Sequence, residues 1–415
     1  MTNEALARPL EGIRVLDLTV ALAGPYGSLL LGGLGAEVIR VEAPGGSDIA
    51  RTNPPFVGAR GLHFEHADPN DISLSLLNRA RNKKSITLDL KSARGRAILG
   101  RLVEHVDVVM ENMSDGTAAR LGVAYEDLSK FNPRIVYASV SAFGDPSAYP
   151  GLKGMDIIVQ ALSGLMGVTG FADGPPTRCG LPVADLLAPL YAVNGILSAL
   201  IHRGRTGEGQ HVKVSMLDCL ASLVAEEHFD VYERAGYALR TGNYHDRLVP
   251  FGVYATADGH VAIVAMMPEW FRALMSAIGR LELIEDPRFS ARGPRMRHAA
   301  EMNALVEAWT RQHTSAEILT ELGTKRGIPC APVRAPGEVL NDPVLRERGA
   351  VVELAHPEYG AMGVAGMGLP IQFSRCHAAF DRPAATLGSA NAEIYGRLLG
   401  IPDQELAALG KAGVI

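Results

Sequence analysis

Apolar residues in the first 145 positions form short runs of strand length, separated by stretches with helical spacing. The runs are rich in Val and Ile and span Arg14–Leu18, Ala36–Glu42, Ser85–Leu90, Val106–Asn112 and Arg134–Val140. Helical stretches lie between them, for example from about residue 92 to 105. Strands that alternate with helices, several of them apolar on both faces, predict a parallel sheet covered on both sides.

A long apolar segment follows Asp185. Its Pro189 fits a helix only in or near the first turn, so we expect a helix to begin within a few residues of Asp185. His211–Leu217 then supplies a further strand. These elements complete a doubly wound, Rossmann-like α/β domain.

The pattern changes beyond about residue 243. Val249–Thr256 and Val261–Met266 flank an Asp-Gly turn, which is typical of a hairpin, and helical stretches follow. We therefore predict a large α/β domain from residues 1–225 plus 331–415, and a smaller α+β domain from residues 226–330.

The composition of the chain excludes several classes of function. The chain has 415 residues and a formal charge of −5, and this mild acidity argues against nucleic-acid binding. No run of 18 apolar residues occurs and the first residues lack the layout of an export signal, so we expect no membrane segment and a cytoplasmic location. The four cysteines and twelve histidines show no ligand spacing, so no metal site is expected.

The first strand–helix turn, Leu18–Pro25, lacks GxGxxG, and no GxxxxGK[ST] loop occurs, which argues against a nicotinamide dehydrogenase. The segment from Gly154 to Asp185 is more informative. Its glycines permit close approach of a ligand, and their N–H groups could surround an oxyanion; they are Gly164, Gly167, Gly170, Gly174 and Gly180. Asp185 follows at a helix N-terminus, which favours its anionic form by roughly 0.3–1 kcal/mol. These residues alone leave N-capping and catalysis both open for Asp185.

Ordered sequence blocks along nearly the whole chain resemble the class III CoA transferases, the group that contains formyl-CoA transferase, carnitine CoA transferase and the α-methylacyl-CoA racemases. The blocks are LEGIRVLDLT, LGAEVIRVE, NKKSITLDLK, VDVVMEN, NPRIVYASVSAFG, VADLLAPLYAVNGILSALIHR and TGEGQHVKVSMLD. The resemblance implies an interlocked homodimer that uses coenzyme A thioesters and needs no metal.

The same resemblance implies a covalent role for Asp185. Its carboxylate would attack the acyl-CoA thioester to give a mixed anhydride, and the CoA thiolate would then convert Asp185 into an enzyme–CoA thioester. Two exchanges replace one difficult direct transfer, because the anhydride conserves the activation of the acyl group. Water must be excluded, since it would hydrolyse the anhydride.

Positions that match CoA contacts of the family are Leu88, Lys91, Asn112 and Arg120. Val20 and Ala21 are further candidates for CoA contact, although formyl-CoA transferase has His-Val-Gln where this chain has Val20, Ala21 and Leu22. Other family contacts are altered, because Ala43, Ser114-Asp115 and Ser141 stand where relatives often carry basic residues or Arg-Pro. We therefore expect neighbouring cations to compensate, with Arg40, Arg51, Lys83 and Lys84 as candidates.

Two alternatives remain open beside CoA transfer. Racemases that resemble this family carry a histidine where this chain has Met155, and a thioether cannot exchange a proton, so racemisation is the less favoured activity. A noncatalytic CoA-binding subunit of a heteromeric transferase is a third hypothesis, and the presence of Asp185 argues against it.

The acceptor is expected to be a short dicarboxylic acid, with succinyl-CoA as the donor. Formyl-CoA transferase has a glycine-rich insertion that is absent between Asn243 and Pro250, which argues against oxalate. Arg51, His245 or Arg247 would suit the second carboxylate of such an acceptor.

Overall fold

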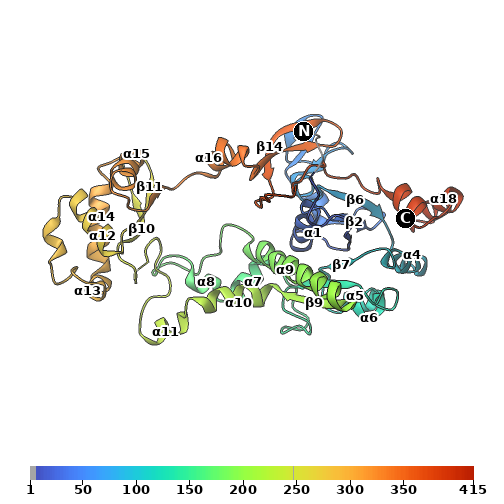
Figure 1. Cartoon of the computed structure of the whole chain (residues 1–415), viewed down its shortest axis with the longest axis horizontal. Coiled ribbons are helices and arrows are strands. Elements are labelled where there is room, and N and C mark those ends of the chain that lie inside the picture. The colour runs from blue at the N-terminus through green and yellow to red at the C-terminus, as the bar shows by residue number, and fades with distance from the viewer. Residues whose placement is uncertain (1–5, 246) are drawn as a thin grey trace. The chain divides into compact units, whose positions relative to one another are not determined.

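The computed structural model describes residues 6–245 and 247–415, and the chain folds into two compact units (Figure 1). The first comprises the chain up to Leu165, Cys179–Glu227 and Leu340–Ile415; the second comprises Met166–Arg178 and His228–Val339. The small domain was expected over residues 226–330, whereas the second unit also takes residues 166–178 and extends to Val339.

A six-stranded parallel sheet organises the first unit. In spatial order its strands are β6 (Lys83–Thr87), β2 (Glu37–Glu42), β1 (Arg14–Asp17), β7 (Val108–Glu111), β8 (Val136–Ser141) and β9 (Gln210–Ser215). The chain begins in the middle, builds one half outward from β1, and then builds the other half from β7. This confirms the doubly wound α/β class, in which ligands bind beyond the carboxyl ends of the strands where the order reverses, here between β1 and β7.

Alternate residues of the strands pack into two hydrophobic layers, one on each face of the sheet. Leu16 and Ile39 belong to the layer that contains α4 (Ala93–Val103) and the C-terminal helices η3 (Ala392–Leu398) and α18 (Asp403–Lys411). Val15 and Val38 belong to the layer that contains α1 (Ala23–Gly33) and α9 (Val183–Thr206). The two-sided apolar character of the strands follows from this arrangement.

Helix α9 is long and apolar enough to cross a membrane by length and composition alone. It packs against α1, β8 and β9, and a central helix of a sheet domain has the same composition, so this is weak evidence for a membrane span. Pro189 lies inside the helix rather than in its first turn, which corrects the expectation. Gly27 of α1 lies against this part of α9, since a Cβ atom built at Gly27 would be in ordinary contact with the Cβ atom of Pro189, at 3.4 Å.

Shorter elements complete the first unit. Its remaining helices are α2 (Ile49–Thr52), α3 (Leu74–Arg79), α5 (Thr117–Leu121), α6 (Tyr125–Leu128), α7 (Asp156–Leu162), α10 (Met216–Glu226) and α17 (Pro343–Glu347). A small sheet contains β4 (Gly61–His63), β3 (Phe56–Gly58) and β5 (Ile72–Ser73), and β13 (Val351–His356) pairs with β14 (Gly360–Met367). Helices α8 (Leu165–Val168) and α16 (Pro336–Leu340) lie where the chain passes between units.

The second unit has its own core around an antiparallel sheet. Its strands are β10 (Phe251–Ala255), β11 (His260–Val264) and β12 (Cys330–Pro332), of which β10 and β11 form the predicted hairpin. Its helices are α11 (Phe229–Arg234), α12 (Pro268–Ala277), η1 (Leu281–Ile284), α13 (Arg292–Arg297), α14 (Ala299–Thr310), α15 (Ser315–Ile318) and η2 (Leu319–Thr324). Buried Tyr254 joins sheet and helices, because its hydroxyl donates to Oδ1 of Asn303 at 2.9 Å.

Candidate active site

Two loops meet where the strand order reverses. Val20 follows β1 and Asn112 follows β7. The Val20 N–H donates to Oδ1 of Asn112 at 2.8 Å, and Nδ2 of Asn112 donates to the Val20 carbonyl at 2.9 Å. This reciprocal pair fixes both loops at the carboxyl edge of the sheet, which is the ligand-binding edge of a doubly wound fold.

Buried Asp48 anchors the same turn from the other side. Its Oδ1 accepts the N–H groups of Ala21 at 3.0 Å and of Ala50 at 2.9 Å, and its Oδ2 pairs with Arg40. Ala21 has a φ of 64°, a left-handed conformation that residues other than glycine rarely adopt. Such a conformation persists only where surrounding contacts hold it, and it is common at functional sites.

The other predicted CoA contacts do not join this cluster. The Leu88 side chain is only 2% exposed and packs in the core, so a contact with a ligand at this position would have to come from the backbone. Lys91 and Arg120 are exposed. Arg120 is held on α5 by a hydrogen bond of 2.7 Å from its guanidinium to Oγ1 of Thr117.

The four cations expected to compensate for missing phosphate contacts are already paired. Arg40 binds Asp48, Arg51 binds Glu42 through two hydrogen bonds of 2.8 and 2.7 Å, and Lys84 binds Glu37 and Glu393. Lys83 is buried and donates to Asp17 at 3.0 Å, and burial lowers its pKa to about 8. The structure therefore does not support a phosphate-binding role for these side chains, and it commits Arg51 to an internal ion pair.

The first turn of α9 is held by a carboxylate from another helix. Oδ1 of Asp156, in the first turn of α7, accepts the N–H groups of Ala184 at 2.8 Å and Asp185 at 3.3 Å. The fully buried Gln160 donates to Oδ2 of Asp156 at 2.7 Å and accepts the Cys179 N–H at 2.9 Å. Asp156 thus occupies two N–H groups that would otherwise be free at the N-terminus of α9, and Gln160 fixes Asp156 and the backbone that precedes the helix.

The Asp185 side chain is half-buried, and among the described residues it forms no hydrogen bond or ion pair. Burial and the negative charge of Asp156 raise its pKa to about 6, while the positive charge of Arg79 opposes the rise. The helix dipole was expected to favour the anion, but burial and a like charge outweigh that effect. A carboxylate of this kind is ionised at neutral pH and is more basic than an ordinary aspartate, as a nucleophile requires.

The five glycines whose N–H groups were expected to surround an oxyanion are divided between the two units. Gly164 and Gly180 belong to the first unit, whereas the other three glycines of the segment belong to the second. Within the second unit the Gly170 carbonyl accepts the Gly242 N–H at 2.9 Å. The expectation of one continuous set of oxyanion donors beside Asp185 is therefore not supported within the first unit.

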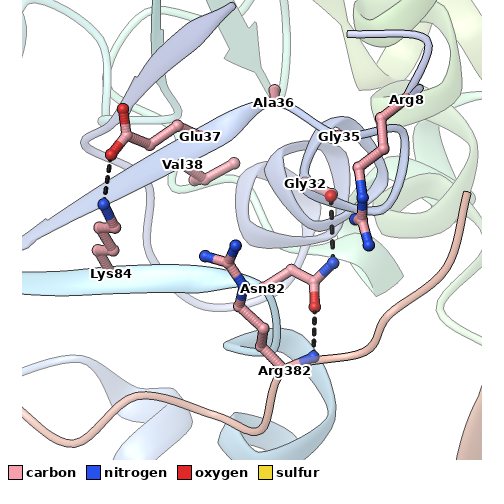
Figure 2. A pocket seen from close by; sticks show the side chains of 9 residues that line it. All are labelled: Arg8, Gly32, Gly35, Ala36, Glu37, Val38, Asn82, Lys84 and Arg382. Atoms are coloured by element: carbon pink, nitrogen blue, oxygen red, sulfur yellow. Dashed lines mark hydrogen bonds and ion pairs between the residues drawn. The ribbon is translucent and has the colours of Figure 1, made fainter. Parts of the chain in front are cut away.

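A cavity of about 170 Å³ lies at the amino ends of β2 and β6 (Figure 2). Lys84 pairs there with Glu37, and Asn82 joins the Gly32 carbonyl, at 3.1 Å, to the Arg382 N–H, at 2.8 Å. Because it lies at the opposite ends of the strands, it is separate from the Val20–Asn112 edge. No group of three or more His, Cys, Asp or Glu side chains suited to a metal occurs within residues 6–245 and 247–415.

Arg79 lies in a basic run with Arg81, Lys83 and Lys84, and such a run predicts either a solvated loop or a local anion site. The sequence did not single out Asp48, Asp156 or Gln160. Asp156 and Gln160 had a detectable signal, because they are four residues apart and therefore share one face of a helix. Asp48 had none, since its role depends on its contacts with Arg40 and Ala21.

Comparison with known proteins shows the family and the fold of the chain. A sequence profile described as CoA-transferase family III matches residues 10–391. A succinate–glutarate CoA-transferase of Agrobacterium fabrum is 35% identical over 94% of this chain and 96% of its own length. A succinyl-CoA–D-citramalate CoA-transferase of Chloroflexus aurantiacus is 36% identical over the full length of both chains. The crystal structure of a CAIB/BAIF family protein from Brucella suis superposes with a TM-score of 0.80 at 34% identity, covering 94% of this chain and all of that one.

Proposed function

This chain belongs to CoA-transferase family III, and we propose that it moves CoA from succinyl-CoA to a short dicarboxylic acid, with Asp185 as the covalent carrier. That the chain is a CoA-transferase follows from the family. The donor, the acceptor class and the intermediates are the proposal. The similar transferases of Agrobacterium and Chloroflexus are named for succinyl-CoA or succinate and a second dicarboxylate, which supports this choice.

In the first half of the reaction an Asp185 oxygen attacks the thioester carbonyl carbon. The C–S bond breaks, CoA leaves as the thiolate, and a mixed anhydride remains on Asp185. The thiolate then attacks the side-chain carbonyl carbon of Asp185, which releases the donor acid as a carboxylate and leaves CoA as a thioester on the enzyme. No proton is consumed, because one carboxylate is exchanged for another.

The second half runs these steps in reverse with the acceptor. Its carboxylate attacks the Asp185 thioester, and CoA thiolate leaves and then attacks the acyl carbon of the new anhydride. The product is the acceptor's CoA thioester, and Asp185 is again a free carboxylate. Both halves of the reaction use the same carboxyl group of Asp185. One fixed carboxylate without a hydrogen-bond partner is therefore sufficient for the whole transfer.

The observation that carries the proposal is the state of the Asp185 carboxylate. Its backbone is held by Asp156, its own oxygens form no hydrogen bond or ion pair among the described residues, and its pKa of about 6 combines ionisation with raised basicity. An ordinary N-capping aspartate would instead use a side-chain oxygen to bind its own helix N–H groups. Here Asp156 does that for α9.

Asn112, Val20 and Ala21 are proposed to line the CoA site, since they form the ordered loops at the carboxyl edge. Lys91 and Arg120 are proposed to contact the charged parts of CoA as exposed cations. Coenzyme A is the only cofactor that the proposal requires.

We also propose that the protein works as an interlocked homodimer in the cytoplasm. Large apolar side chains are exposed on α7, α9 and α10, which supports burial of these helices against a second chain. They are Ile157, Ile158, Leu162, Leu190, Tyr191, Ile201 and Leu223.

The test combines a substrate panel with detection of the adduct. Purified protein is incubated with succinyl-CoA and one of several acids, and new acyl-CoA is quantified by chromatography; the expected result is transfer to dicarboxylates of four or five carbons. After incubation with donor alone, mass spectrometry should find CoA on the peptide that contains Asp185. Asp185→Asn is the control and should form no adduct. Full turnover by that variant would refute the proposal.

A further inference from the structure

Arg79 is a half-buried cation near the candidate nucleophile. It is the last residue of α3, and its Nε donates to the Ser75 carbonyl at 2.8 Å, one turn earlier. This contact fixes the side chain and leaves the two terminal nitrogens of the guanidinium available. Among the described residues, these nitrogens form no hydrogen bond or ion pair.

The neighbouring cations differ from Arg79 in this respect. Arg40, Arg51 and Lys83 each pair with a carboxylate inside the fold. Arg81 donates to Oδ1 of Asn78 and to the Met367 carbonyl, both at 2.6 Å. Arg79 is therefore the cation of this group whose terminal nitrogens have no acceptor among the described residues, and a guanidinium that is partly removed from water without an acceptor costs free energy.

The packing of the helices brings Arg79 toward Asp185. Helix α1 packs against both α3, which ends at Arg79, and α9, which carries Asp185 in its first turn. The charge of each of these two side chains shifts the pKa of the other. Asp48, the other acidic neighbour of Arg79, already accepts two N–H groups and pairs with Arg40.

We infer that Arg79 binds the distal carboxylate of the dicarboxylic substrate while the proximal carboxyl group reacts at Asp185. This deepens the proposed function and rests on it. The two terminal nitrogens can form two parallel hydrogen bonds with a carboxylate, a geometry that also sets the direction of the substrate. Succinyl-CoA would use the same contact in the first half of the reaction, and the acceptor would use it in the second. The residue is therefore proposed to determine the preference for dicarboxylates.

The experiment compares two donors that differ at one group. Succinyl-CoA has a distal carboxylate, and butyryl-CoA has a methyl group in its place. In a ping-pong reaction kcat/KM for the donor reports only the first half, so the acceptor does not affect the comparison. Arg79→Met should lower the ratio of kcat/KM for succinyl-CoA over butyryl-CoA by about 10- to 100-fold, as expected for loss of hydrogen bonds to a charged group. Arg79→Lys keeps the charge without the planar fork and should lose only part of the preference.

Using the ratio removes indirect effects. Loss of the Arg79 charge also changes the basicity of Asp185, but that acts equally on both donors. Arg382→Met is the matched control, because it removes an arginine charge at the opposite ends of the strands (Figure 2). It should leave the ratio unchanged.

Two results would overturn the inference alone. An unchanged ratio, with or without an equal fall of kcat/KM for both donors, would mean that Arg79 does not bind the distal carboxylate and acts on Asp185 or on the fold. Weaker binding of free CoA to Arg79→Met, measured by calorimetry, would assign the guanidinium to the CoA phosphates. The absence of transfer by the unmodified protein with every donor would instead refute the proposed function and the inference together.

Discussion

Replacing Asp185 by Asn should abolish transfer and also stabilise the fold at neutral pH. Burial and the charge of Asp156 raise the pKa of Asp185 from 3.8 to about 6, so the folded protein disfavours the ionised form. The contribution of the neutral carboxyl group to stability is fully present below pH 3.8 and is lost as the pH rises through about 6. At neutral pH the unmodified protein therefore bears the cost of a buried, ionised carboxylate next to another one, and Asn has nearly the same shape without the charge.

The magnitude follows from the same values. A difference of about two pKa units corresponds to about 3 kcal/mol, since each unit is 1.36 kcal/mol. The side chain is half-buried, so solvent screens part of this energy and we expect a gain of about 1–2 kcal/mol for Asp185→Asn at pH 8. The gain should be smaller by about 1 kcal/mol at pH 5, where the folded carboxyl group is largely protonated.

The assay is urea unfolding at pH 5 and pH 8 without CoA, with the transition of the first unit followed for both proteins. Asp403→Asn is the control: this aspartate is exposed in the first turn of α18, and removal of its charge should destabilise slightly by the loss of a helix-dipole interaction. The reasoning is refuted if Asp185→Asn is destabilising at pH 8, or if its effect is the same at both pH values.

Two further predictions concern residues that support the site. Asp156→Asn removes the like charge, so the acid limb of the pH profile of donor kcat/KM should move to lower pH, while Oδ1 of Asn can still accept the Ala184 N–H. A profile that stays in place would contradict the electrostatic role of Asp156 on Asp185. Lys83→Met leaves the buried Asp17 without its cation and should destabilise the fold by about 3–5 kcal/mol in urea unfolding, whereas a loss below about 1 kcal/mol would show that the Ser28 and Thr19 hydroxyl groups suffice for Asp17.

Local sequence patterns were sufficient for the main elements of the fold. The five Val- and Ile-rich runs predicted five strands of the parallel sheet, because a strand buried on both faces needs apolar residues at consecutive positions, and His211–Leu217 predicted the sixth. The hairpin of the second unit was also found, since alternation and an Asp-Gly turn are local signals. The helix expected near Asp185 begins at Val183, which a long apolar segment in the sequence also indicates locally.

The details of the site depended on contacts between distant parts of the chain. Val20 and Asn112 are 92 residues apart and meet only because β1 and β7 are neighbours in the sheet. Leu88 matched a family contact, yet its side chain points into the core, because orientation at the end of β6 is set by packing. Pro189 is tolerated inside α9, although a proline there removes the N–H that would bond the Asp185 carbonyl.

The sequence by itself determined the α/β class, the family resemblance and the identity of the candidate nucleophile, since these rest on local periodicity and on motifs that can be read in order. Only the tertiary structure decided the chemical state of that nucleophile. The helix dipole, a local effect, favours an ordinary anionic Asp185, whereas burial and Asp156, brought from a separate helix 29 residues away, raise its pKa and leave its oxygens unoccupied. Charges and solvent exposure act through space, so their balance exists only after the helices have packed.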